Sequence, residues 1–274
     1  PKARRIRCRR RAHQSSLVLD QLFDAALKAS QRREASISEQ DLLDKISISP
    51  KPVDVYAALE KTDHIKLIAE IKRRSPSRGF LAEILSAANQ AELYERSGAH
   101  AISVLTEESG FGGELQDLVD ARTTTTIPLL RKDFISTEYQ ILEARAAGAD
   151  FVLLILAWLP EERFRALYAY AEQLGLGVLV ETHTLEEIAI ANNAGSRLIG
   201  INTRDLQTFK TDLGLFEQMA QALSSEAIKV AESSVKSVAD VIRYRNAGAD
   251  VALVGEALVT SDPEILIPEF TSVA

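Results

Sequence analysis

Eight short apolar runs recur along this chain of 274 residues, and they constrain its fold more than any other feature. Each run has the length and composition of a strand buried on both faces, and helix-like segments separate successive runs. The runs span residues 67–71, 101–105, 127–130, 151–156, 177–180, 198–201, 228–231 and 251–254. Eight strand–helix units of even length predict an α/β fold, a (β/α)8 TIM barrel. A doubly wound sheet is the alternative, but it does not require eight such units.

A weak internal repeat marks the joins between helices and strands. The four-residue segments 97–100, 147–150, 194–197 and 247–250 all carry glycine in second place, which suits the left-handed position that ends a helix. Helix-like segments at 83–96, 137–147, 161–174 and 237–247 precede or follow these joins. The repeat therefore favours successive βα units over two unrelated domains.

The segment before the first run has a helical pattern and no strand pattern. A helix is expected at 17–33 with Ser15 or Ser16 as its cap, and shorter helices at 38–46 and 53–59. We expect residues 15–62 to pack as helical padding on a barrel, so that residues 15–274 form a single domain.

Composition excludes several classes of protein. Apolar residues make up 46% of the chain, yet no apolar run approaches the roughly 20 residues needed to cross a bilayer. The single cysteine, Cys8, excludes an internal disulfide and favours a reducing compartment, so we expect a cytoplasmic protein. The four histidines lack the spacing of metal ligands, and no P-loop or GxGxxG motif is present. We therefore expect no metal, no cofactor and no membrane partner.

Charge is unevenly distributed. The formal net charge is −7, although residues 1–14 hold seven lysines and arginines and no acid. The acidic remainder argues against nucleic acid as a partner. The basic segment could be a nucleic-acid arm or part of a targeting peptide. We expect instead a disordered tail left by processing or expression.

Polar residues follow seven of the eight runs, at the strand ends where barrels of this kind carry their active sites. One such group would be typical of a helix cap or a solvated loop, whereas seven on one face predict a site. The groups begin at Glu70, Thr106, Arg131, Glu181, Asn202, Glu232 and Gly255.

Five of these side chains suggest acid–base chemistry. Glu70 and Lys72 lie two apart, so a strand places them on one face, where they could also be a structural ion pair. Lys132, Glu181 and Glu232 are expected in the same mouth. Lysines among carboxylates stay charged and can donate protons, while carboxylates in a partly dry cleft can act as bases.

Two short loops that enter helices suggest a phosphate site. Ser233–Ser234 and Gly255–Glu256 follow the last two strands, where backbone N–H groups commonly hold phosphate in this fold. Together the residues predict an acid–base enzyme for a phosphorylated small molecule.

Seven motifs also resemble those of one family, in order and at matching spacing. They are IAEIKRRSPSRG, SVLTEESGFGGELQDL, LLRKDF, YQILEARAAGAD, LVETH, GINTRDL and LVGEAL, between about residues 67 and 258. The chain thus resembles indole-3-glycerol phosphate synthase of tryptophan biosynthesis. The resemblance implies a lyase that closes the ring of 1-(2-carboxyphenylamino)-1-deoxyribulose 5-phosphate, with loss of CO2 and then water. The helices at 15–62 match the family's extra segment over the mouth.

The resemblance also implies roles for individual residues. Lys132 corresponds to the general acid that protonates the substrate carbonyl, and Glu181 to the carboxylate that acts as base or stabilises positive charge. Glu70 and Lys72 correspond to the pair that binds the substrate carboxylate and assists dehydration. The further polar groups expected at the site are Asn202, Arg204, Glu232 and Ser233.

Other positions correspond to the walls of the site. The phosphate grip implied by the resemblance comprises Ser75, Ser234, Gly255 and Glu256, and the apolar wall comprises Phe111, Phe134 and Leu206. Two further positions depart from the family pattern, because Thr203 replaces an asparagine and Ser234 a glycine. We expect little effect from Thr203, which should face away from its neighbours. Ser234 could weaken phosphate binding if the glycine used a positive φ, or it could add a hydroxyl contact.

Two other functions remain open on the residues alone. Phosphoribosylanthranilate isomerase, another phosphate-binding barrel, would use a cysteine and an aspartate, but Cys8 lies far from any strand end. A barrel kept only for binding would have no need of so many charged strand ends, which cost stability. For either enzyme the expected partner is a small phosphorylated substrate, and we expect a monomer.

Overall fold

The structure, a computed structural model, describes residues 17–76, 78–84, 86–205 and 211–274. The basic segment 1–14 with Cys8, the proposed cap at Ser15 or Ser16, and Leu206 lie outside the described residues. Predictions that concern them are therefore not addressed by the fold.

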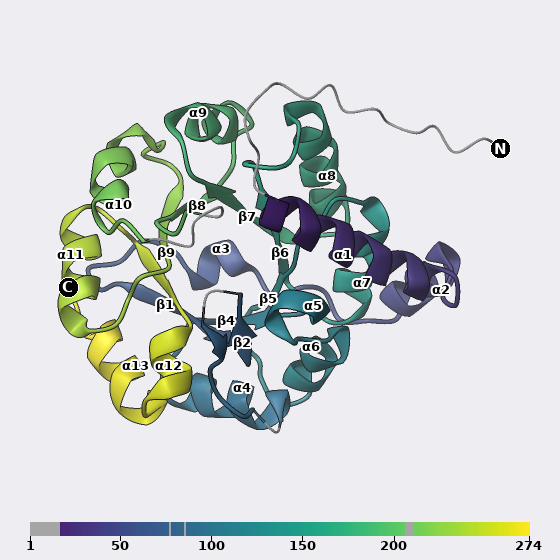
Figure 1. Ribbon diagram of the computed structural model, residues 1–274, viewed down its shortest axis with the longest axis horizontal. Coiled ribbons are helices and arrows are strands. Elements are labelled where there is room, and N and C mark those ends of the chain that lie inside the picture. The colour runs from purple at the N-terminus through teal and green to yellow at the C-terminus, as the bar shows by residue number, and fades with distance from the viewer. Residues whose placement is uncertain (1–16, 77, 85, 206–210) are drawn as a thin grey trace.

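Eight parallel strands close into a barrel in the order β1-β10-β9-β8-β7-β6-β5-β4, and helices surround it (Figure 1). The strands are β1 (Lys66–Ile71), β4 (Ala101–Leu105), β5 (Leu129–Lys132), β6 (Phe151–Ile155), β7 (Gly177–Thr182), β8 (Leu198–Asn202), β9 (Ile228–Glu232) and β10 (Val251–Val254). All eight predicted runs are confirmed as strands. β5 begins two residues later than its apolar run because Pro128 has no N–H for the ladder.

The outer helices follow the predicted alternation. They are α4 (Ala87–Arg96), α6 (Leu115–Arg122), α7 (Glu138–Ala146), α8 (Glu161–Gln173), α9 (Leu185–Asn193), α10 (Gly214–Met219), α11 (Val238–Asn246) and α13 (Pro263–Thr271). Two shorter helices, α5 (Glu108–Phe111) and α12 (Glu256–Thr260), follow β4 and β10. The glycines of the four predicted helix-to-strand joins have positive φ, as expected: Gly98, Gly148, Gly195 and Gly248.

Two elements of the fold differ from the sequence-based expectation. α4 begins at Ala87 and not at residue 83, because the Ser86 hydroxyl accepts from the Asn89 N–H and caps the helix there. The segment after β1 was expected to be a polar loop, but it contains a small antiparallel hairpin of β2 (Arg74–Ser75) and β3 (Gly79–Phe80).

Apolar side chains fill the inside of the barrel and the layer between strands and helices. The interior cluster includes Leu130, Leu153, Leu198 and Val230 from the strands. The short α3 (Val55–Ala58) adds Val55 to this cluster at the first residue of β7, where a Cβ on Gly177 would lie 2.4 Å from Val55 Cγ1. α3 thus closes the amino-terminal end of the barrel.

The first helix, α1 (Leu17–Glu34), lies across the opposite end (Figure 1). Phe23 stacks on Trp158 at 3.9 Å between ring centroids, and the Trp158 indole N–H donates to Asp20 at 3.1 Å. Near its end, Arg33 donates to both carboxylate oxygens of Glu143 on α7. α2 (Glu39–Ser47) then packs Leu42 against α7. These contacts fix α1 beside the carboxyl ends of the strands.

Within the described ranges, no helix has both the length and the apolar character required to span a membrane.

Candidate active site

A cavity of about 740 Å³ opens at the carboxyl ends of the strands, beneath α1. Thirteen of the fifteen predicted site residues line it: Glu70, Lys72, Ser75, Phe111, Lys132, Phe134, Glu181, Asn202, Arg204, Ser233, Ser234, Gly255 and Glu256. Glu232 is fully buried and does not line the cavity, and Leu206 is not described. The barrel therefore brings together groups that are up to 186 residues apart in the sequence.

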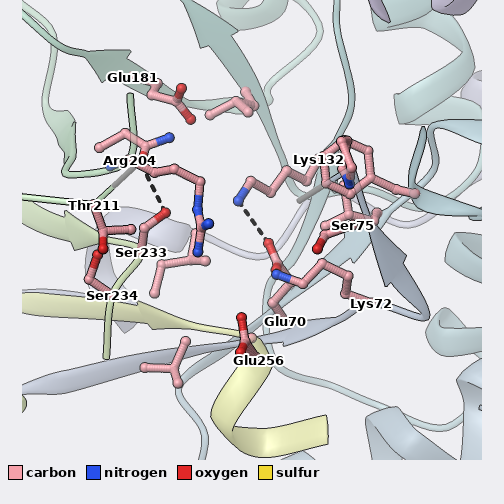
Figure 2. A pocket seen from close by; sticks show the side chains of 18 of the residues that line it. Glu70, Lys72, Ser75, Lys132, Glu181, Arg204, Thr211, Ser233, Ser234 and Glu256 are labelled. Carbon is pink, nitrogen blue, oxygen red and sulfur yellow. Dashed lines mark hydrogen bonds and ion pairs between the residues drawn. The ribbon is translucent and has the colours of Figure 1, made fainter. Parts of the chain in front are cut away.

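Lysines from two strands share one buried carboxylate. Lys132 Nζ donates to Glu70 Oε2 at 2.7 Å, and Lys72 Nζ lies 2.5 Å from Glu70 Oε1 (Figure 2). Burial by itself would raise the pKa of Glu70, but the charges of Lys132 and Lys72 lower it to about 2. Burial would lower the pKa of Lys132, yet the carboxylates of Glu70, Glu232 and Glu181 raise it. The cluster therefore holds one ionised carboxylate and two ammonium groups.

Two further carboxyl groups, those of Glu232 and Glu181, lie near Lys132. Glu232 Oε2 is 4.0 Å from Lys132 Nζ, and burial together with the charge of Glu181 raises the pKa of Glu232 well above its ordinary value. Neither oxygen of Glu232, nor Oε1 of Glu181, has a hydrogen-bond partner among the described residues. Buried polar atoms are normally paired, so these oxygens mark a place where a ligand or water can bind.

Two glycines make room for this charge. A Cβ on Gly200 would lie 2.0 Å from Glu232 Oε1, and one on Gly255 would lie 2.3 Å from Glu70 Oε1. Real Cβ atoms do not approach oxygens so closely. The two carboxyl groups can therefore lie inside the barrel only because the strand and the loop beside them lack side chains.

The loop after β9 has an unusual backbone. Ser233 and Ser234 have φ of 71° and 69°, and they are the only residues other than glycine with positive φ in the described chain. The possibility that position 234 uses a positive φ is therefore confirmed. Each non-glycine residue held in this region costs about 1–2 kcal/mol, so surrounding contacts must stabilise the loop.

Aromatic and aliphatic groups form the other wall. Phe111 and Phe134 line the cavity as predicted, with ring centroids 6.1 Å apart. Leu19 and Leu22 of α1 also line it, although the sequence reasoning did not assign them to the site. Both leucines lie in the helix predicted at 17–33, which the resemblance placed over the mouth, so their apolar side chains could have been assigned to the cavity wall.

His183 was also missed as part of the site. Its Nε2 lies 3.4 Å from Glu181 Oε1 and its Nδ1 3.7 Å from Glu187 Oε2. Burial lowers the pKa of His183, but Glu187, Glu181 and Asp205 together raise it by a larger amount, so the net shift is upward. The histidine lies beside the cavity lining and follows Glu181 by two residues, just beyond the end of β7, the spacing that indicated the Glu70–Lys72 pair.

Cationic groups converge on the centre of the cavity from three sides: Lys132, Lys72 and Arg204 (Figure 2). Lys236 adds another basic side chain to the lining. Within the described ranges, no three histidine, cysteine or acidic side chains are arranged to hold a metal ion. The fold and site thus define a (β/α)8 barrel enzyme with an acid–base centre suited to an anionic small molecule.

Comparisons with known proteins identify the family. The sequence model of the indole-3-glycerol phosphate synthase family matches residues 19–269, and the chain belongs to this family. Indole-3-glycerol phosphate synthase of Leifsonia xyli subsp. xyli is 49% identical over 93% of this chain and 98% of its own length. The enzyme named indole-3-glycerol phosphate synthase 1 from Streptomyces coelicolor is 45% identical over 93% of this chain and 95% of its own.

A solved structure supports the fold alone. Thiamine phosphate pyrophosphorylase from Pyrococcus furiosus superimposes with a TM-score of 0.58 at 15% identity, covering 76% of this chain and 95% of its own.

Proposed function

We propose that the cavity converts 1-(2-carboxyphenylamino)-1-deoxyribulose 5-phosphate to indole-3-glycerol phosphate, CO2 and water, and that the enzyme is a carboxy-lyase. The observation that carries this proposal is the position of Lys132. Its ammonium group lies between Glu70 and Glu232 and borders the cavity. Membership of the synthase family supports the same reaction.

Lys132 is proposed as the acid for ring closure. The ring carbon that carries the carboxylate attacks the substrate carbonyl carbon, and Lys132 gives its proton to the carbonyl oxygen. Loss of CO2 then returns the bonding electrons to the ring. The carboxylates around Lys132 keep it protonated until the substrate arrives, because they raise its pKa.

The remaining charged groups are proposed to serve binding and dehydration. Glu70 holds Lys132 and Lys72 and stays ionised, since its pKa is about 2. The proton for the departing hydroxyl therefore comes from Lys72, and Glu181 takes a proton from the substrate as the indole ring forms. Burial and the charge of Glu181 raise the pKa of Glu232, so uptake of a proton by Glu232 would relieve the repulsion between the two carboxyl groups.

The walls are proposed to select the substrate. Phe111 and Phe134, with Leu19 and Leu22, contact the aromatic ring. The phosphate binds near Ser75, Ser234 and Gly255, and Arg204 contributes positive charge. We further propose that the protein acts as a monomer in the cytoplasm, with residues 15–274 as one domain.

The test is a direct assay. Purified protein is mixed with the carboxyphenylamino-deoxyribulose phosphate, without added metal or nucleotide, and indole fluorescence is followed. In Lys132→Met we expect kcat to fall by about 10²–10⁴-fold, the range for loss of a general acid. Lys229→Met is a matched control, because Lys229 lies on β9 outside the cavity lining and should retain turnover. Normal turnover by folded Lys132→Met would exclude the assigned acid.

A further inference from the structure

Three hydroxyl groups meet at the left-handed loop, and two of them belong to residues outside the cavity lining. Thr203 follows β8, Ser234 follows β9 and Tyr244 lies on α11. Thr203 Oγ1 is 2.9 Å from Ser234 Oγ and 3.1 Å from the Tyr244 hydroxyl. Thr203 is 1% exposed and Tyr244 is fully buried. Only Ser234 of the three lines the cavity.

The contacts of this cluster all hold the backbone of the loop. Thr203 Oγ1 donates to the Glu232 carbonyl at 3.0 Å, and the Thr203 N–H donates to the same oxygen at 3.1 Å. The Tyr244 hydroxyl donates to the Ser233 carbonyl at 3.2 Å. Ser234 can then donate to Thr203, so each hydroxyl proton has an acceptor. On the cavity side, Ser233 Oγ donates to Asn202 Oδ1 at 2.9 Å.

These bonds surround the two residues that have positive φ. Ser233 and Ser234 adopt a conformation that glycine enters without cost and that serine avoids. Ser234 is held there by its own side chain, and Ser233 by its carbonyl and its hydroxyl. The hydroxyl cluster therefore substitutes for the conformational freedom of glycine.

The loop so held presents donors at the cavity. Within the described chain, the backbone N–H groups of Ser234 and Val235 have no protein acceptor, and both residues line the cavity. Five basic and four acidic side chains line the same cavity, so its formal charge is positive and suits an anion. Backbone N–H groups near basic side chains are the usual protein ligands of phosphate.

We propose that Thr203 and Tyr244 are positioning residues for substrate phosphate, acting through Ser234. Neither contacts the substrate. Their hydroxyls hold Ser233 and Ser234 left-handed, so that the N–H groups of Ser234 and Val235 face the phosphate before it binds. This inference rests on the proposed function only for the identity of the substrate that carries the phosphate.

The inference gives Thr203 a larger role than the sequence predicted. Residue 203 does not line the cavity, which agrees with a side chain that faces away from its neighbours. Its hydroxyl nevertheless contacts the other position at which this chain departs from the family pattern, 31 residues away. A threonine at 203 and a serine at 234 therefore work as a pair.

Thr203→Val is the first variant to test, because it removes the hydroxyl and keeps the shape. We expect KM for the substrate and Kd for inorganic phosphate, measured by titration calorimetry, to rise about five- to tenfold, the value of one lost hydrogen bond. kcat should change by less than about twofold, since Thr203 does not touch the reacting atoms. Ser234→Ala should behave like Thr203→Val, since alanine loses the hydroxyl but keeps the unfavourable φ.

Glycine at 234 provides the rescue. In the double variant of Thr203→Val with Ser234→Gly, we expect both constants to return to within about twofold of the wild type, because glycine needs no support at positive φ. Tyr244→Phe should raise them as well. Tyr139→Phe is its matched control, since Tyr139 also donates to one backbone carbonyl, that of Ile37, but lies away from the cavity.

The outcomes separate the two proposals. Unchanged KM and phosphate Kd in Thr203→Val, with only a lower melting temperature, would overturn the positioning role and leave the reaction standing. Failure of the glycine to rescue would also overturn it. If the wild type does not turn over the substrate, but Thr203→Val binds phosphate more weakly than the wild type, the positioning role is supported and the reaction is rejected.

Discussion

Arg131 and Lys132 are neighbours on β5, yet the two cations lie in opposite kinds of surroundings. Arg131 is fully buried between the barrel and its outer helices, whereas Lys132 borders the cavity. Both are paired with carboxylates. The two networks differ in how many of their carboxylate oxygens have hydrogen-bond partners within the protein.

The surroundings of Arg131 are complete. Its three guanidinium nitrogens donate to four acceptors, which are Thr106 Oγ1, the Gln140 carbonyl, Glu143 and Asp133, at 2.7–3.3 Å. Asp133 also accepts from Thr106 and from the Phe134 N–H, and Glu143 accepts from Arg33 of α1. Every charged group of this network has at least two partners within the protein, and the network joins β5 to α7 and α1.

The surroundings of Lys132 are incomplete. Glu232 and Glu181 have oxygens with no hydrogen-bond partner in the described chain, and the ammonium of Lys132 borders a cavity of about 740 Å³. Burying such groups costs stability that a closed network would recover. Buried charge alone therefore does not indicate a site, whereas buried charged groups that lack hydrogen-bond partners beside a cavity do.

Arg131→Met should have the largest effect on stability. Removing one member of a buried network leaves Asp133 and Glu143 without their cation, and we expect a loss of about 3–5 kcal/mol in the free energy of unfolding. Urea denaturation of Arg131→Met and Lys132→Met, side by side, measures the contrast. The arginine variant should keep kcat per folded molecule, whereas the lysine variant should lose turnover and lose less stability than the arginine variant, because Lys72 stays paired with Glu70. If both variants lose the same property, the two networks do not differ in role.

Glu70 should make stability depend on acid pH. Its pKa is about 2 in the folded protein and near 4.5 in the unfolded chain, so the unfolded state binds more protons between these values. The stability it contributes is complete above pH 4.5 and is lost as pH falls toward 2, in total roughly 3 kcal/mol. Urea midpoints between pH 7 and pH 3 should fall less steeply for Glu70→Gln than for the wild type. Equal slopes would contradict the assigned ion pairs.

Glu232 should make stability depend on pH in the opposite direction. Its pKa is raised in the folded state, so the folded protein binds more protons and stability falls as pH rises above the unfolded value near 4.5. Glu232→Gln should therefore gain stability relative to the wild type between pH 5 and pH 8. The same titration serves as the control for Glu70→Gln, because the two substitutions remove one carboxylate each from a single cluster. A loss of stability at pH 8 would show that Glu232 is ionised and paired.

Much of this molecule was predictable from local patterns. Short apolar runs, glycines at the ends of helices and polar residues after each strand depend on residues close together in the sequence. They predicted eight strands, and they predicted that Lys72, Lys132 and Glu181 share one end of the barrel. The pair at 70 and 72 was visible because a strand repeats every two residues.

The sequence alone therefore determined the barrel, the end of the barrel at which the cavity opens, and the protein family that its motifs indicate. Only the tertiary structure decided which charged groups have partners, because closure of the barrel sets which residues from distant strands meet. It decided that Leu19 and Leu22 reach the cavity, and that Thr203 meets Ser234. Such contacts join residues tens to hundreds of positions apart, and their distances follow from strand register and helix packing, which no local pattern specifies.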